Sequence, residues 1–298
     1  TFEDANFNKV KTRIKDLTKG LNVEIDTIAQ KAISEMFDGI ETRVIDEYLA
    51  SIAVNSNVHP DYSYLAGRIL ASSVHKETSI HKLTDEEKEK VAKELKKNKL
   101  DEDHKYIVKI KKSLIDDPKR EEILKRYLSG QKVTDKEIDY LVSTPHFYYA
   151  MKTMHESIFD EDGNETKGLI SDELFATVQA HREKIESKID YSRDFNFDYF
   201  GFKTLEKAYL LKKHTSYSKM EKVVKEENGE QKITMEKVNK IKSQTIERPQ
   251  DMFMRVALGI CGDDLDRAFR LYDLMSNGYY THATPTLFNA GTRRAQMS

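Results

Sequence analysis

Three polar side chains in the first quarter of the chain have the chemistry to hold a nucleotide. Thr42, Asp46 and Lys76 are predicted to lie on separate helices that converge. A hydroxyl and a lysine ammonium suit phosphate oxygens, and a carboxylate can accept a hydrogen bond from a ribose hydroxyl. From their spacing alone, a simpler interpretation is favoured, namely a helix N-cap, a surface acid and a surface lysine.

A second polar segment lies near the end of the sequence, at residues 281–292. It contains Thr284, Thr286 and Thr292 together with Gly291. Hydroxyls, a glycine and backbone N–H groups are able to cradle a diphosphate. An ordinary polar loop explains the same residues, and spacing alone favours that loop. We expect extended and turn conformations from residue 279 to residue 298, because the pattern there is not helical.

Other catalytic or metal-binding motifs are missing from the sequence. It has no P-loop, GxGxxG, HExxH or GxSxG pattern, and its nine histidines lack the spacing of metal ligands. We interpret His75, His81 and His104 as surface residues. The lone Cys261 excludes an internal disulfide and a cysteine-clustered metal site, and suits a reducing cytosol. The simplest interpretation of Cys261 is a small residue at a helix end.

Composition and charge favour a mainly helical protein and argue against a nucleic-acid-binding or membrane-spanning one. Of the 298 residues 34% are charged, and only 5 are Pro and 12 are Gly, so a mainly helical fold is predicted. The net charge of -2 argues against a nucleic-acid partner bound by phosphate neutralisation. The sequence has no run of about 18 apolar residues that would span a membrane. The first residues lack the features of a signal peptide, so a cytoplasmic protein is expected.

Helical periodicity predicts the elements that position these residues. Apolar residues three and four apart predict four helices over residues 6–76, and a thin core predicts a small helical insertion in the charged segment that follows. The helix starts in that segment are two capping boxes and an Asp-Pro pair: Thr84 with Glu87, Asp117-Pro118, and Thr134 with Glu137.

Aromatic-rich helices are predicted again from residue 145, with one interruption. Val223 and Val224 face Ile233 and Met235 across Asn228-Gly229, which predicts a β-hairpin over 220–237 that projects into solvent. Two helices are expected after it, one starting near residue 249 and one over 263–276. The aromatic residues of 191–202 are interpreted as large rings that cement a helix junction.

Several longer runs of the sequence share one pattern. They are residues 248–260, which begin Arg-Pro-Gln-Asp-Met, residues 280–292, residues 191–205, and the pair of short runs 59–62 and 75–78. Together these runs resemble the large (α) subunit of class I ribonucleotide reductase. Residues 1–78 resemble the ATP-cone, which is the regulatory nucleotide-binding module of that family.

The resemblance implies a mainly α fold in three parts. Residues 1–78 are expected to form an ATP-cone-like domain without its leading strands, and residues 79–144 a charged helical insertion. Residues 145–298 are expected to form the helical N-terminal domain that precedes a ten-stranded α/β barrel, with the start of the substrate pocket. The segments 80–144 and 214–245 match no pattern of the family and are interpreted as an inserted helical segment and an inserted β-hairpin.

The resemblance also implies an activity, which is the reduction of ribonucleoside diphosphates to deoxyribonucleoside diphosphates. In the family, a thiyl radical made with the radical-generating small (β) subunit removes a ribose hydrogen, and a cysteine pair supplies the electrons. Cys261 matches no catalytic cysteine, so no catalytic residue is expected in this chain. The expected partners are a barrel-bearing C-terminal part of the large subunit, the small subunit and further copies of the chain, with no membrane and no nucleic acid.

The resemblance assigns binding roles residue by residue. Thr284 and Ser298 match substrate-binding positions. ATP or dATP is the expected allosteric effector, with Mg²⁺ accompanying the nucleotide and no metal held by the chain's own ligands. The positions that match effector contacts are Glu3, Asp4, Ala5, Asn6, Phe7, Asn8, Lys9, Thr42, Asp46 and Lys76.

Two alternatives stay open from the sequence. The chain starts with Thr1 and ends with Ser298, which suggests a split gene product, a split intein half or a truncated chain, with a split product slightly favoured. The rival function is a non-catalytic module that senses ATP or dATP and controls assembly. The segment 281–292 discriminates between the two, because a pure sensor would not need a substrate loop.

Overall fold

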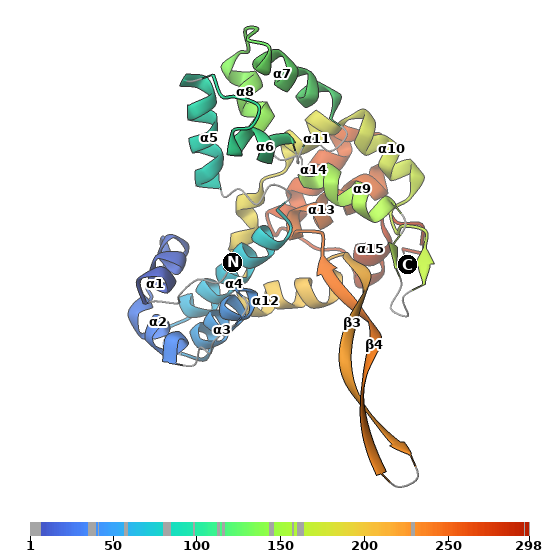
Figure 1. The fold of residues 1–298 in the computed structure, drawn as a ribbon. Coiled ribbons are helices and arrows are strands. Elements are labelled where there is room, and N and C mark those ends of the chain that lie inside the picture. Colours follow the sequence, from blue (N-terminus) through green and yellow to red (C-terminus); the bar gives the residue numbers. More distant parts are fainter. Residues whose placement is uncertain are drawn as a thin grey trace.

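The computed structural model describes most of the chain and is mainly helical, as predicted (Figure 1). The ranges it describes are 7–34, 40, 42–56, 59–79, 85–97, 99–111, 114, 117–142, 146–156, 158–159, 164–227, 230–294 and 296–297. Within these ranges no helix has both the length and the apolar character needed to cross a membrane.

Four helices make up the first part of the fold. They are α1 (Phe7–Lys15), α2 (Ile25–Ser34), α3 (Thr42–Asn55) and α4 (Asp61–Glu77). Their apolar stripes meet in one core, where Ile14, Ile28, Leu49 and Leu65 are fully buried. The structure confirms the four helices predicted over 6–76. Burial of their apolar stripes stabilises these short helices.

A close backbone contact joins this first part to a much later segment. Helix α4 packs against the 3-10 helix η2 (Tyr191–Asn196) and helix α12 (Tyr199–Thr204). A Cβ atom added to Gly67 of α4 would lie 2.2 Å from the backbone oxygen of Phe197, so the contact requires glycine. Phe202 is fully buried in the core of the first part. The aromatic cluster therefore cements a helix junction, as predicted.

Four further helices surround a second core. They are α5 (Asp85–Lys97), α6 (Lys105–Lys111), α7 (Pro118–Leu128) and α8 (Asp135–Val142), and they group at one end of the molecule (Figure 1). The Asp117 carboxylate accepts from the Arg120 N–H at 3.1 Å, as an N-cap does. Thr134 and Glu137 bond reciprocally, which confirms that capping box. The predicted box at Thr84 lies outside the described residues.

The third core is built around one central helix, α13 (Pro249–Cys261), whose residues from Pro249 to Leu258 are all buried. Helix α14 (Leu265–Ser276) packs on it, which confirms both predicted helices. The other helices of this part are α9 (His146–His155), α10 (Asp172–Ala180), α11 (Arg182–Lys188), the π-helix η3 (Leu205–Tyr209) and α15 (Thr284–Asn289).

Helix α15 overturns the prediction that the tail after residue 279 is not helical. Pro285 occupies the first turn of α15, where a missing N–H donor costs nothing. Leu287 turns inward and is 5% exposed. A short turn of helix thus forms where the local sequence favours a loop, because the neighbouring core buries its apolar residue.

The sheet has four strands in the order β2-β1-β3-β4. Strands β3 (Lys212–Glu227) and β4 (Glu230–Thr245) pair antiparallel along their whole length, from Lys212 opposite Thr245 to Glu227 opposite Glu230. Figure 1 shows this hairpin extending away from the helices, which confirms the predicted projection, although the strands are longer than the predicted 220–237. Residues 228 and 229, the predicted turn, lie outside the described residues. The two short strands β1 (Ile158–Phe159) and β2 (Glu165–Thr166) had no sequence signal.

Candidate nucleotide and substrate sites

The first candidate site gathers two cations and one carboxylate on the outside of the four-helix part. Asp46 of α3 is 2% exposed, and its carboxylate accepts hydrogen bonds from Nε of Arg13 at 2.5 Å and from Nη2 of the same side chain. Lys76 is exposed on the last turn of α4. Burial and the nearby Arg13 lower the pKa of Lys76, while Asp46 opposes that shift. The charges of the three side chains, which come from α1, α3 and α4, therefore interact electrostatically.

This geometry corrects one prediction about the cluster. Thr42 and Asp46 both lie in α3, four residues apart, so only Lys76 comes from a separate helix. The sequence analysis also missed Arg13, which supplies the second cation. Helical spacing offers a signal for it, because Arg13 follows Lys9 by four residues and such residues share one helix face.

The remaining expected effector contacts are placed only in part. Phe7 is half-buried and Asn8 is exposed at the start of α1. The Lys11 ammonium lies 5.9 Å from the centre of the Phe7 ring. The other expected contacts lie outside the described residues: Glu3, Asp4, Ala5 and Asn6 entirely, and Lys9 and Thr42 in their side chains.

A separate set of ion pairs connects α3 and α4 with η3. Arg43 of α3 contacts Glu77 of α4 at 3.0 Å and Glu206 of η3 at 3.7 Å. Lys203 contacts Glu206 at 2.9 Å. Burial raises the pKa of the Glu77 carboxyl, and Arg43 acts against that shift.

The second candidate site is the surface around helix α15. Thr284 is exposed at the first position of this helix, and its hydroxyl lies 3.0 Å from the hydroxyl of Tyr209. The Tyr209 ring stacks on Phe288, with 5.0 Å between ring centres. Ser298, the other expected substrate contact, lies outside the described residues. Thr284 is therefore presented to solvent from an ordered helix rather than from a loose loop.

A buried arginine fixes the segment that follows Thr284. Arg255 and Glu247 are both fully buried, and Nε of Arg255 donates to Glu247 at 2.5 Å. The same guanidinium donates to the backbone oxygens of Leu287 at 3.1 Å and Ala290 at 2.8 Å. Burial raises the pKa of Glu247, and Arg255 acts against that shift. Sequence analysis did not single out Arg255, although it lies within the run 248–260.

Helix α13 approaches the same segment with its backbone. A Cβ atom on Gly259 would lie 2.2 Å from the backbone nitrogen of Gly291, and Gly291 itself has a φ of +77°. Beside this contact lies a cavity of about 240 Å³, lined in part by Ser171, Asn289 and Thr292. Thr284 is not among the residues that line this cavity.

Two expectations about single residues meet different outcomes. Cys261 is the last residue of α13, as predicted, and burial raises the pKa of its thiol, which disfavours a nucleophilic thiolate. His75 is not a surface residue, which corrects that prediction. Its Nε2 lies 2.7 Å from a carboxylate oxygen of the fully buried Asp194. His104 is partly exposed, and His81 lies outside the described residues.

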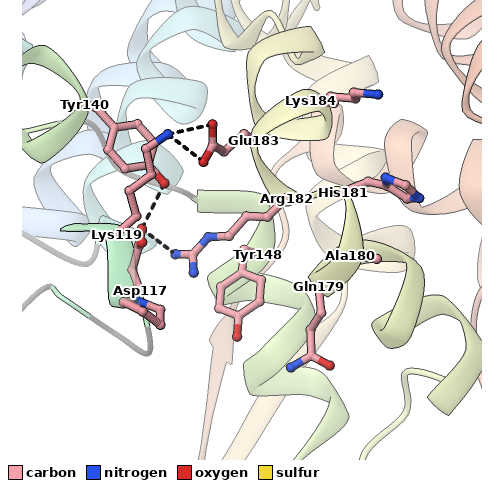
Figure 2. Close-up of a pocket in the computed structure, with 11 residues that line it drawn as sticks. Asp117, Lys119, Tyr140, Tyr148, Gln179, Ala180, His181, Arg182, Glu183 and Lys184 are labelled. Carbon is pink, nitrogen blue, oxygen red and sulfur yellow. Dashed lines mark hydrogen bonds and ion pairs between the residues drawn. The ribbon is translucent and has the colours of Figure 1, made fainter. Parts of the chain in front are cut away.

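A wide cleft of about 560 Å³ separates α7 and α8 from α9–α11 (Figure 2). Figure 2 shows Lys119 pointing toward Glu183 and Arg182 toward Asp117, whereas Lys184 points away from them. Lys119 donates to both oxygens of Glu183, at 2.8 and 2.9 Å, and Arg182 lies 3.3 Å from the Asp117 carboxylate. The Arg182 guanidinium also sits 3.8 Å from the centre of the Tyr148 ring. These ion pairs connect the helices α7 and α8 with α9–α11 across the cleft.

Glu186 gives a pH-dependent stability that can be measured. Its carboxyl accepts from the Tyr148 N–H at 2.7 Å, and burial raises its pKa to about 8. The unfolded chain releases this proton near pH 4.3, so Glu186 should lower the stability progressively as the pH rises toward 8 and add no further loss above it. Glu186→Gln should therefore gain melting temperature relative to the wild type between pH 5 and 8. Glu173→Gln, an exposed control on α10, should differ from the wild type in melting temperature by the same amount at every pH. Equal pH profiles of the melting temperature for Glu186→Gln and wild type would contradict the raised pKa of Glu186.

No group of three or more His, Cys, Asp or Glu side chains in the described ranges is arranged to hold a metal ion. The two candidate sites consist of two cations, the Asp46 carboxylate paired with Arg13, hydroxyls and backbone groups. That donor set matches an anionic ligand with phosphate oxygens.

Comparisons with known proteins agree with this architecture. The family model described as "Ribonucleotide reductase, all-alpha domain" matches residues 228–295. The chain is 32% identical to the ribonucleoside-diphosphate reductase large subunit of Caenorhabditis elegans, over 99% of this chain and 26% of that protein. It is also 32% identical to the large subunits of Plasmodium falciparum (isolate Dd2) and Variola virus, over 99% of this chain and 25% and 27% of those proteins.

The chain is therefore similar, over nearly its whole length, to the N-terminal part of ribonucleotide reductase large subunits, and residues 228–295 match the all-alpha domain of that family. It spans about a quarter of the length of the curated relatives it matches.

Proposed function

We propose that this chain is the N-terminal part of a ribonucleoside-diphosphate reductase large subunit that reduces ribonucleoside diphosphates. The observation that carries the proposal is the similarity to such large subunits over 99% of the chain. A barrel-bearing part of the large subunit and a radical-generating small subunit supply the thiol and radical chemistry. This chain supplies one wall of the substrate pocket and an effector site.

The substrate role falls to the segment held by Arg255. Thr284 offers a hydroxyl at the start of α15, and Tyr209 holds that hydroxyl within hydrogen-bond distance. The hydroxyl donates to a phosphate oxygen of the ribonucleoside diphosphate. Arg255, buried behind the segment, positions it without touching the substrate.

The effector role falls to the cluster on α1, α3 and α4. Arg13 and Lys76 supply positive charge for the phosphates of ATP or dATP, with Mg²⁺ accompanying the nucleotide. Asp46 holds Arg13 in place while no nucleotide is bound. A contact from Asp46 to the ribose requires this pair to open, because both carboxylate oxygens accept from Arg13.

The proposal is tested by reductase turnover. The chain is mixed with a polypeptide carrying the remaining part of a large subunit, a small subunit and cytidine diphosphate, and the deoxy product is measured. Turnover that requires this chain supports the proposal. If the mixture assembles in an ATP- or dATP-dependent manner without turnover, the proposed reductase function is wrong and the chain is a non-catalytic sensing module.

Removal of the Thr284 hydroxyl should weaken substrate binding in that mixture. Because Thr284 is exposed, we expect Thr284→Val to cost about 1 kcal/mol, the net value of one hydrogen bond. The measurement is the KM for cytidine diphosphate, with Thr215→Val, exposed on β3 and outside the site, as the matched control whose KM should stay unchanged. An unchanged KM in Thr284→Val would remove Thr284 from the substrate site.

A further inference from the structure

A second polar cavity lies where three parts of the chain meet, away from both sites described above. It measures about 260 Å³, and its walls include Ser79 after α4, Lys88 of α5, Tyr191 of η2 and Arg248 just before α13. His75 and His146 complete its inner wall. Each of the three buried cores of the fold thus lies next to one wall of the cavity.

The charges on these walls have one sign. Lys88 and Arg248 are cations, and none of the lining residues that the structure describes is acidic. Arg248 is held in a fixed orientation, because its Nε donates to the Thr78 hydroxyl at 2.8 Å and its Nη2 donates to the His75 backbone oxygen at 3.1 Å. Its guanidinium lies 5.0 Å from the centre of the Tyr191 ring. Such a guanidinium is pre-organised for an oxyanion.

The acidic groups behind the inner wall are already engaged. Asp251 accepts from the Tyr191 hydroxyl at 2.6 Å and from the Arg248 N–H at 2.7 Å. Asp194 lies behind His75, with a carboxylate oxygen 2.7 Å from His75 Nε2, and it accepts from the Gln250 backbone N–H at 3.1 Å. Burial lowers the pKa of His75 and raises the pKa of Asp194. Both carboxylates thus have partners within the protein, and neither belongs to the lining of the cavity.

We propose that this cavity binds a small phosphate-class anion, such as phosphate or pyrophosphate, between Lys88 and Arg248. The volume is below the range of about 300–1,000 Å³ that is typical of sites for larger ligands, so it suits the anion rather than a whole nucleotide. The bound anion joins α4 to α5 and to the start of α13. His75 and Lys76 are adjacent on α4, so this helix contacts the anion cavity through one residue and the nucleotide cluster through the next.

The test is calorimetry of the whole chain with sodium pyrophosphate and, separately, with sodium phosphate. Lys88→Gln is the test variant, and Lys90→Gln is the matched control, because Lys90 is exposed on the same helix and does not line the cavity. We expect pyrophosphate binding in the wild type and in Lys90→Gln, and more than tenfold weaker binding in Lys88→Gln. Circular dichroism checks that all variants remain folded.

Two further arms separate this cavity from the proposed nucleotide cluster. Lys76→Gln should leave pyrophosphate binding intact, and Lys88→Gln should leave ATP binding intact. Loss of pyrophosphate binding in Lys76→Gln would place the anion in the nucleotide cluster and overturn the proposal. Equal pyrophosphate affinity in Lys88→Gln and wild type, or no heat with either anion, would overturn it as well. If ATP displaces pyrophosphate from the cavity of Lys76→Gln, the anion that binds there is the phosphate group of a nucleotide.

Discussion

Arg255→Met is expected to lower the free energy of unfolding by about 3–5 kcal/mol, the usual cost of removing one partner of a buried ion pair. The methionine fills similar space but leaves the Glu247 carboxylate fully buried without its guanidinium. The backbone oxygens of Leu287 and Ala290 lose their donor at the same time. The helix that presents Thr284 should therefore loosen together with the core.

Denaturant unfolding measures this loss directly. Arg267→Met on the exposed face of α14 is the matched control and should change the stability by less than about 0.5 kcal/mol. The double variant Arg255→Met with Glu247→Leu should recover much of the loss, because it removes the unpaired charge as well. A single variant as stable as the control would show that the buried pair does not hold the segment.

Lys76→Gln is expected to weaken dATP binding by about 1.5–3 kcal/mol, the value of hydrogen bonds to a charged group, or roughly 10- to 150-fold. Lys76 brings its charge to Arg13 and Asp46 from a separate helix, so a bound phosphate would bridge α4 to α1. The glutamine side chain is one atom shorter and can still donate hydrogen bonds, but it carries no charge.

Calorimetry with dATP and with ATP measures the effect. Lys31→Gln, exposed on α2, carries the same charge change outside the cluster and should bind both nucleotides as the wild type does. The proposed effector site would hold dATP through ionic contacts, so raising the salt concentration should weaken dATP binding to the wild type more than dATP binding to Lys76→Gln. Equal affinities of wild type and Lys76→Gln would remove this lysine from the effector site.

Contacts of α4 connect the region around Lys76 with the segment that contains Tyr209. The outer face of α4 carries Lys76, and Gly67 on the same helix lies directly on the backbone of residues 197 and 198. Arg43 and Glu206 extend the contact toward η3, the π-helix that contains Tyr209. A shift of α4 on nucleotide binding would therefore reach the residue that holds the Thr284 hydroxyl.

Local signals in the sequence determined most helices and the long hairpin of this protein, but not α15, β1 or β2. The capping box at Thr134 and Glu137, the Asp117-Pro118 start and the alternating residues before and after Asn228-Gly229 depend on neighbours within a few residues. Such interactions form in much the same way in any fold, so the helices and the hairpin were predictable. Runs such as 248–260 indicated the family for a different reason. Their resemblance rests on the order of residues alone and requires no knowledge of the three-dimensional structure.

Only the tertiary structure decided which residues meet. The partner of Asp46 is Arg13, 33 positions earlier, and the partner of His75 is Asp194, 119 positions later. Packing by distant segments, rather than local preference, left His75 only partly exposed and made residues 284–289 helical. Contacts over such separations depend on how whole helices pack, and the pattern of nearby residues carries no record of that packing.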